Sequence, residues 1–82
     1  MGYSLQDDIR ENIAKYFGKD QVKDADNLEK DLGANTVDLV ELSNKLEGIY
    51  GIEDLEGEIV YGGVKTVGDI ITLIMRKKDL LR

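Results

Sequence analysis

Apolar side chains recur at helical spacing near the start of the chain. They form one stripe with a repeat of four residues: Leu5, Ile9, Ile13 and Phe17. Ser4 followed by Asp7 is a capping-box pattern, and the repeat stops at Gly18, a typical residue after a helix. This pattern predicts a helix over residues 4–17.

A second stripe of the same kind lies in the middle of the chain: Leu39, Leu42, Leu46 and Tyr50. These positions fall within about 80° of one another on a helix, which is narrow enough to face a core. Asn35 followed by Asp38 gives a second capping pattern, and Gly51 follows the last apolar residue. We expect a helix over residues 36–49.

The third stripe lies near the end of the chain: Val67, Ile70, Ile71 and Ile74. Thr66 followed by Asp69 is a third capping pattern. The stripe fades into the basic run 76–78, whose charge suits the negative end of a helix dipole. The pattern therefore predicts a last helix that starts just after Thr66.

The connecting segments are polar and rich in turn-forming residues. Residues 18–34 read as a long ordered loop with a few apolar anchors: Val22, Leu28 and Leu32. Residues 52–63 leave room for one short helix from Leu55 to Tyr61. No segment alternates with period two, so we expect an all-α fold: a small antiparallel four-helix bundle with three principal helices and one short one, as a single domain over residues 1–82.

Composition narrows the possible functions. The 82 residues include no Cys and no His, which excludes thiolate metal sites, disulfides and the familiar catalytic triads, so we do not expect an enzyme. Apolar runs never exceed three residues, so we expect no membrane span and no signal-peptide core, and a soluble cytoplasmic protein. We also expect a monomer with no membrane partner. Asp24 and Asp26 begin like a calcium loop, but Leu28 stands at the next ligand position, and we expect no metal site.

The negative charge is concentrated in one part of the chain. The formal net charge is −6, and residues 24–61 carry eleven acids against Lys30 and Lys45. Such a segment repels nucleic acid and attracts partner proteins with basic patches. The alternative is a solvated acidic surface that only maintains solubility.

One face of the 36–49 helix carries apolar residues that the core does not need. Val37 and Val40 lie outside the core stripe, with Asn44 between them, in a sector bounded by Glu41 and Glu47. An apolar centre with a charged rim is typical of a partner-docking patch. Single exposed apolar residues are also ordinary, and both interpretations remain open.

Thr36 stands at the first helical position after the Asn35 cap, close to this face. Its hydroxyl is expected to be exposed. A phosphodiester attached there would lie beside free backbone N–H groups and the positive end of the helix dipole, both of which favour an anion.

The run from Asp31 to Leu42, DLGANTVDLVEL, resembles the modification-site motif of acyl carrier proteins. In that motif Gly and a small residue precede Asp-Ser-Leu-Asp, and Val-Glu-Leu follows. Leu46-Glu47 is similar to the end of the family's second helix, and residues 65–69 are similar to the turn that opens its last helix. The resemblance extends over nearly the whole chain, in order.

The resemblance implies a four-helix carrier whose serine at the start of the second helix receives 4′-phosphopantetheine from a coenzyme A-dependent transferase. The thiol of that arm carries acyl groups as thioesters to fatty-acid or polyketide-type enzymes. Here Thr36 stands at the position of the serine. Asn35 stands where the family has the preceding Asp, and Val37 stands where it has the following Leu. The extra methyl of Thr crowds the attacking oxygen, so transfer is expected to be slower. Asn44 and Gly48 also depart from the family pattern, and a mid-helix Gly is expected to loosen the end of the 36–49 helix.

In the carrier interpretation, the partners are the phosphopantetheinyl transferase and acyl-processing enzymes with basic docking patches. Asp38, Glu41 and Glu47 would contact the basic residues, with Val37 and Val40 at the centre. The alternative is a carrier-like domain that has lost the arm and acts as a protein-binding or regulatory module.

A second hydroxyl on the 36–49 helix and a set of apolar residues were also considered for functional roles. Ser43 lies seven residues after Thr36 but lacks a preceding cap, and an ordinary mid-helix Ser is the better interpretation. In the family the acyl chain is sheltered among the helices, which suggests six residues as lining or core: Leu42, Leu46, Ile49, Ile59, Ile70 and Ile74.

Overall fold

The computed structural model describes residues 3–80, with the side chain of Leu80 excepted. In order along the chain, its helices are α1 (Leu5–Phe17), α2 (Thr36–Tyr50), the short π-helix η1 (Gly57–Tyr61) and α3 (Val67–Leu80). Extended pairing in the described part is limited to an isolated antiparallel bridge between Asn27 and Thr66. The all-α fold with three principal helices and one short helix is confirmed.

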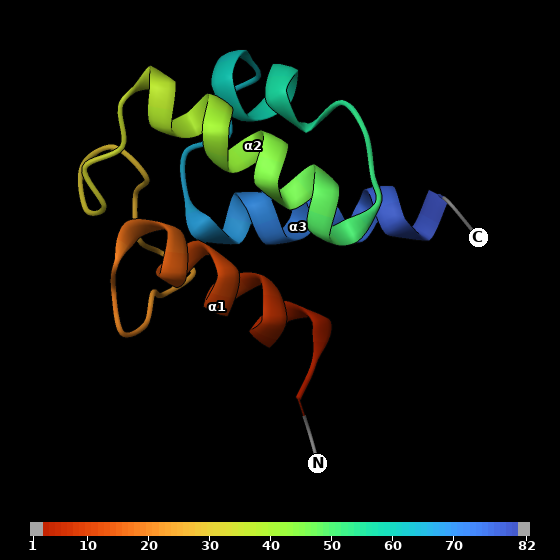
Figure 1. Cartoon of the computed structure of the whole chain (residues 1–82), viewed down its shortest axis with the longest axis horizontal. Coiled ribbons are helices and arrows are strands. Elements are labelled where there is room, and N and C mark those ends of the chain that lie inside the picture. Colours follow the sequence, from red (N-terminus) through yellow and green to blue (C-terminus); the bar gives the residue numbers. More distant parts are fainter. Residues whose placement is uncertain (1–2, 81–82) are drawn as a thin grey trace.

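The helices form a flattened bundle with extents of 34 × 31 × 19 Å. α1 packs against both α2 and α3, and η1 packs against α2. α2 and α3 both run opposite to α1 (Figure 1). Within residues 3–80, no helix is long and apolar enough to span a bilayer.

Each principal helix begins with the reciprocal cap expected from its sequence. In every case the first residue's side chain accepts a backbone N–H three residues later, and that later carboxylate accepts an N–H in return. The pairs are Ser4–Asp7, Asn35–Asp38 and Thr66–Asp69. The helix boundaries therefore follow from local chemistry, and α2 extends one residue beyond the expected end.

A single apolar core joins the helices and the long loop. The three predicted stripes supply most of it. Of the expected anchors in the 18–34 loop, Val22 and Leu28 are buried and Leu32 is half-buried against the core. Among the described side chains, eleven are at most 1% exposed: Ile9, Ile13, Leu28, Leu42, Ser43, Leu46, Leu55, Ile59, Val67, Ile70 and Ile74. Because the loop contributes to the core, it is an integral part of the domain.

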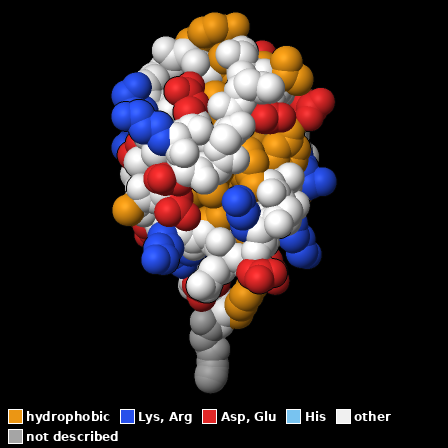
Figure 2. All heavy atoms as spheres, turned by 90° about the vertical axis from the view of Figure 1, so that its left-hand side faces the viewer, with side chains coloured by type: hydrophobic (Ala, Val, Ile, Leu, Met, Phe, Trp, Pro, Cys, Tyr) orange, Lys and Arg blue, Asp and Glu red, His pale blue; other side chains and the backbone are white. Residues whose placement is uncertain are grey.

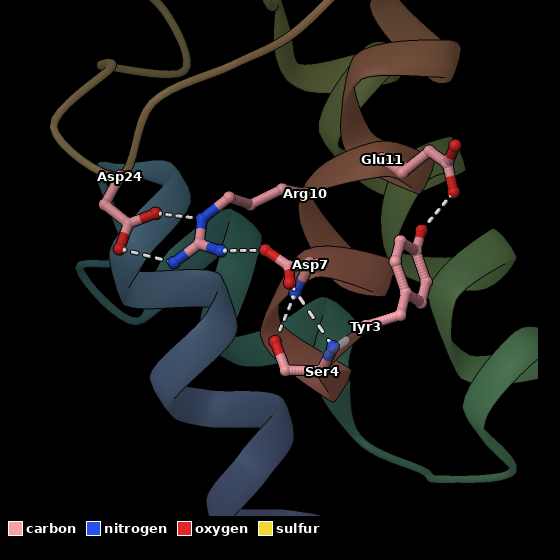
Figure 3. Close-up of polar contacts among 6 residues, drawn as sticks. All are labelled: Tyr3, Ser4, Asp7, Arg10, Glu11 and Asp24. Atoms are coloured by element: carbon pink, nitrogen blue, oxygen red, sulfur yellow. Dashed lines mark hydrogen bonds and ion pairs between the residues drawn. The ribbon is translucent and has the colours of Figure 1, made fainter. Parts of the chain in front are cut away.

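An ion pair fastens the 18–34 loop to α1. The Arg10 guanidinium contacts both carboxylate oxygens of Asp24, at 2.6 and 3.1 Å, and Asp7 at 3.0 Å (Figure 3). The hydrogen bond from Arg10 lowers the pKa of Asp24. The Asp24 carbonyl also accepts the Gly68 N–H at 2.9 Å. A side chain at Gly68 would lie 3.2 Å from that carbonyl oxygen, so glycine permits the approach of the loop to α3.

The short helix starts at Leu55, where it was expected, but its hydrogen bonds widen to the π form over η1. Its first N–H, that of Leu55, is bonded to the Glu47 carboxylate at 2.9 Å. At its end, a Cβ on Gly62 would come within 2.7 Å of the Glu58 Cα. The glycine therefore allows the tight exit from η1 into the 62–65 loop.

Candidate functional site

Thr36 is the first residue of α2, and its side chain is exposed. The Asn35 Oδ1 accepts the Asp38 N–H at 2.8 Å, so Asn35 rather than Thr36 caps the helix. The Thr36 hydroxyl has no hydrogen-bond partner among residues 3–80. It is consequently available to a modifying enzyme.

The backbone around Thr36 suits an attached phosphodiester. The Thr36 and Val37 N–H groups have no acceptor in the described part of the chain, whereas the next two, of Asp38 and Leu39, bond to Asn35. Free N–H groups and the positive end of the dipole of a 15-residue helix both favour an anion at this position. The residues present therefore fit a phosphate-linked arm.

α2 contains a second aliphatic hydroxyl, that of Ser43, which does not compete with Thr36. Ser43 is fully buried, and its Oγ donates to the Leu39 carbonyl at 2.6 Å. This is the ordinary mid-helix role expected for it. Within α2, which the structure describes in full, Thr36 is the exposed aliphatic hydroxyl.

The outer face of α2 has the predicted apolar residues on its surface. Val37 is 63% exposed, Val40 is half-buried and Asn44 is exposed. The structure thus brings these residues to one face, adjacent to Thr36.

Each acid of this face also has a partner within the domain, and the sequence indicated that of Asp38 but not those of Glu41 and Glu47. Glu41 accepts the Tyr16 hydroxyl of α1 at 2.7 Å, and this bond raises the pKa of Tyr16 to about 12. Glu47 is half-buried and holds the Leu55 N–H, while Asp38 belongs to the cap. Glu41 is the acid that remains exposed on this face.

A cavity of about 410 Å³ lies beside the first turn of α2. That volume is in the roughly 300–1,000 Å³ range of small-molecule sites. Its lining comes from the 27–30 turn, α2, η1 and the 63–65 loop: Asn27, Leu28, Glu29, Lys30, Leu39, Ile59, Val60, Tyr61, Gly63, Val64 and Lys65. On the face that carries the 18–34 loop and the start of α2, hydrophobic side chains lie exposed between acidic and basic ones (Figure 2).

The cavity corrects the expectation for acyl-chain lining. Of the six residues suggested by sequence, Ile59 lines this cavity, and Leu42, Leu46, Ile70 and Ile74 are packed at 0% exposure. Ile49 is 44% exposed, so its placement in the core was wrong. Ile49 follows the buried Leu42 by seven residues, about 20° around the helix, so the apolar pattern of α2 gave no signal of this exposure.

Comparisons with known proteins place this architecture in a class. The family model for the phosphopantetheine attachment site matches residues 7–74. The chain is 32% identical over 78 residues to an acyl carrier protein of Chlamydia muridarum, covering 93% of this chain and 99% of that protein. It is 36% identical over 79 residues to an acyl carrier protein of Wolinella succinogenes, covering 92% and 99%.

The chain therefore belongs to the acyl carrier protein family. Acyl carrier proteins carry acyl groups on 4′-phosphopantetheine and are carriers rather than catalysts. They interact with a phosphopantetheinyl transferase and with acyl-processing enzymes.

Proposed function

We propose that this chain carries acyl groups on an arm attached at Thr36 and delivers them to fatty-acid or polyketide-type biosynthetic enzymes. One observation carries the proposal: Thr36 presents an exposed, unbonded hydroxyl on the first turn of a capped helix, within the DLGANTVDLVEL run. In this role the protein acts as a single-domain monomer.

The residues of the chain have distinct roles in this function. Asn35 and Asp38 keep the helix start closed, which holds the Thr36 hydroxyl outward. The Thr36 and Val37 N–H groups stabilise negative charge at the attachment point. When bound, the arm supplies a thiol that holds the acyl group as a thioester. The Thr36 methyl restricts rotation of the side chain and slows its modification relative to serine.

The test is modification by a broad-specificity phosphopantetheinyl transferase with coenzyme A, followed by intact mass. We expect slow but measurable gain of one arm, faster gain in Thr36→Ser and none in Thr36→Ala. Thr72→Ala is the matched control because Thr72 is an exposed threonine on α3, and it should modify like the parent. No gain in the parent with full gain in Thr36→Ser would reject Thr36 as the attachment residue.

The second candidate function is a carrier-like domain without an arm that acts as a protein-binding or regulatory module. The replacement of serine by Thr36 favours it. This function requires the α2 face but no hydroxyl. Retained partner binding by Thr36→Ala, together with an unmodifiable parent, would support it.

In either case the docking face is the outer side of α2, with Val37 and Val40 at its centre and Asn44 beside them. Glu41 is its exposed acid, and Asp38 and Glu47 lie at its edges. We propose basic patches on the partner enzymes as the complementary surfaces.

Charge reversal tests the docking face. Glu41→Lys in the Thr36→Ser background is expected to lower kcat/KM of the transferase several-fold at low ionic strength and less at high salt, because salt screens exposed charges. The control is Glu53→Lys, at an exposed acid outside α2. Equal losses in the two variants would contradict a docking role for Glu41 and indicate a general effect of net charge.

A further inference from the structure

Glu41 is the exposed acid of the outer α2 face, and a side chain from another helix holds it. The Tyr16 hydroxyl of α1 donates to its Oε1 at 2.7 Å, across 25 residues of sequence. Among residues 3–80, the Glu41 Oε2 has no hydrogen-bond partner, and no Lys or Arg forms an ion pair with this carboxylate. One oxygen of the carboxylate is therefore fixed and the other is open.

The donor is itself held in place. Tyr16 is half-buried against the apolar core, and its ring meets the Phe17 ring edge-on, with the centroids 5.1 Å apart and the planes at 87°. The hydrogen bond to Glu41 raises the pKa of Tyr16 to about 12, so the hydroxyl stays protonated as a donor near neutral pH. A firmly packed, neutral donor thus fixes a flexible acidic side chain.

Lys45 would be the ordinary partner of Glu41. It lies one helical turn further along α2, at the spacing where glutamate and lysine side chains attract each other. In the described part of the chain these two residues form no ion pair, and Glu41 contacts Tyr16 instead. The choice of partner matters for docking, because a lysine would neutralise the acid, whereas a phenol holds it and leaves its negative charge for another protein.

The same two helices are also joined by a buried tyrosine–carboxylate contact, which allows a comparison. Near the other end of α2 the Tyr50 hydroxyl donates to Asp8 at 2.6 Å, and Tyr50 is only 8% exposed. The contact between Tyr16 and Glu41 is exposed, so both groups would otherwise be hydrogen-bonded to water and the net gain in stability is small. What the exposed contact does provide is a fixed acid on the docking face.

We propose that Tyr16 is a positioning residue for partner docking: it fixes the Glu41 carboxylate so that the open Oε2 meets a basic side chain of the phosphopantetheinyl transferase. This inference rests on the proposed docking face and extends that face from α2 onto α1. A free glutamate loses rotamer freedom when a partner binds it, and a glutamate that is already held loses less. The unneutralised charge also attracts the partner from a distance.

The test compares Tyr16→Phe with its parent, both in the Thr36→Ser background, as substrates of the transferase with coenzyme A. We expect the KM for the carrier to rise about two- to five-fold with kcat unchanged, because docking weakens while the reacting hydroxyl stays in place. In Glu41→Ala, Tyr16→Phe should have no effect on KM, because the carboxylate that Tyr16 positions is gone. An unchanged KM, or a rise that persists in Glu41→Ala, would overturn the proposal.

Two other tyrosines separate positioning from stability. Tyr3→Phe removes a second tyrosine–glutamate hydrogen bond, the one to Glu11 (Figure 3), and should leave KM unchanged. Tyr50→Phe removes the buried contact between α1 and α2, so it should lower the melting temperature more than Tyr16→Phe and raise KM less. If KM rose in proportion to the lost stability across the three variants, Tyr16 would be a structural residue only and the proposal would be wrong.

A second readout does not depend on the transferase. Three-bond NMR couplings about the Cα–Cβ bond of Glu41 should indicate one rotamer in the parent and an average of several in Tyr16→Phe; equal couplings would also overturn the proposal. The mass test of Thr36→Ser decides the carrier function separately. Mass gain there with an unchanged KM in Tyr16→Phe rejects this inference alone, whereas no mass gain rejects the carrier function and this inference with it.

Discussion

The two ends of α2 are held in different ways. At its C-terminal end the Tyr50 hydroxyl donates to Asp8 at 2.6 Å and accepts from Asn12 at 3.0 Å. The Tyr50 carbonyl accepts the Lys78 ammonium at 3.1 Å, and Glu47 holds the Leu55 N–H. This end is therefore bonded to α1, to α3 and to the start of the short helix.

The N-terminal end of α2 is bonded mainly within itself. Its polar contacts are the reciprocal cap between Asn35 and Asp38 and the backbone bonds of the first turn. Thr36 and Val37 are exposed, and a cavity lies beside Leu39. The two ends of one helix thus differ: the C-terminal end is anchored to other elements, and the locally closed N-terminal end leaves a hydroxyl and an apolar face accessible, with a cavity beside them.

The largest expected difference concerns the buried and outer faces of the helix. Leu46→Ala should lower the free energy of unfolding by about 2–5 kcal/mol, because it opens a cavity at a side chain that is 0% exposed. Val37→Ala, on the outer face, should change it by less than about 0.5 kcal/mol. Urea unfolding measures both values. A large loss in Val37→Ala would mean that this residue belongs to the core and not to a docking surface.

The next difference isolates the anchored end. Tyr50→Phe should lower the free energy of unfolding by about 1–3 kcal/mol, because Asp8 and Asn12 lose a buried hydrogen-bond partner. Burial, with the bond to Asp8, raises the pKa of Tyr50, so the hydroxyl stays protonated as a donor. Tyr61→Phe is the control, since Tyr61 is 80% exposed. Equal stabilities of the two variants would show that the bonds of Tyr50 do not anchor α2.

Two glycines near the C-terminal end of α2 should have opposite effects on stability when they are replaced by alanine. Gly48 has ordinary helical backbone and nothing near its missing Cβ, so Gly48→Ala should raise the free energy of unfolding by about 1 kcal/mol. Gly51 has a φ of +64°, and Gly51→Ala should lower it by about 1–2 kcal/mol. Thermal melting followed by circular dichroism distinguishes the two signs. A destabilised Gly48→Ala would point to a contact that requires glycine.

The smallest effect is expected where α3 begins, near the cavity. Backbone N–H bonds from Lys65, with help from Thr66, lower the pKa of Asp69. The ionised Asp69 carboxylate therefore stabilises the folded state fully above its pKa in the unfolded chain, near 4. This stabilisation is lost as the pH falls through the lower pKa of the folded state. Asp69→Asn should cost less than about 1 kcal/mol at pH 7 and nothing in acid, since the group is exposed. Denaturant unfolding at several pH values provides the check; a cost that persists in acid would indicate lost packing.

Much of the fold was predictable because its signals are local. The three capping pairs and the three apolar stripes mark the starts of the principal helices, and the ends of α1 and α2, to within one residue. The short helix from Leu55 and the loop anchors Val22 and Leu28 were also correct. Such features depend on residues three or four positions apart, which a chain shows directly.

Other features depend on residues that are distant in sequence. Tyr16 and Glu41 meet only because α1 packs on α2, and Glu47 binds Leu55 only because the chain turns back after Gly51. The apolar pattern of the sequence also gave no signal of the π form of η1 or of the exposure of Ile49. The expected acyl lining included Leu42 and Leu46, but the packing of the helices buries both side chains completely.

The sequence by itself determined the helices, their caps, the acidic middle of the chain and the position of Thr36 at a helix start. These depend on short-range hydrogen bonding and on hydrophobic periodicity. Only the tertiary structure decided that the C-terminal end of α2 is anchored to α1 and α3. It also decided that Lys30 and Lys65 share one cavity, because long-range backbone bonds bring their two loops together.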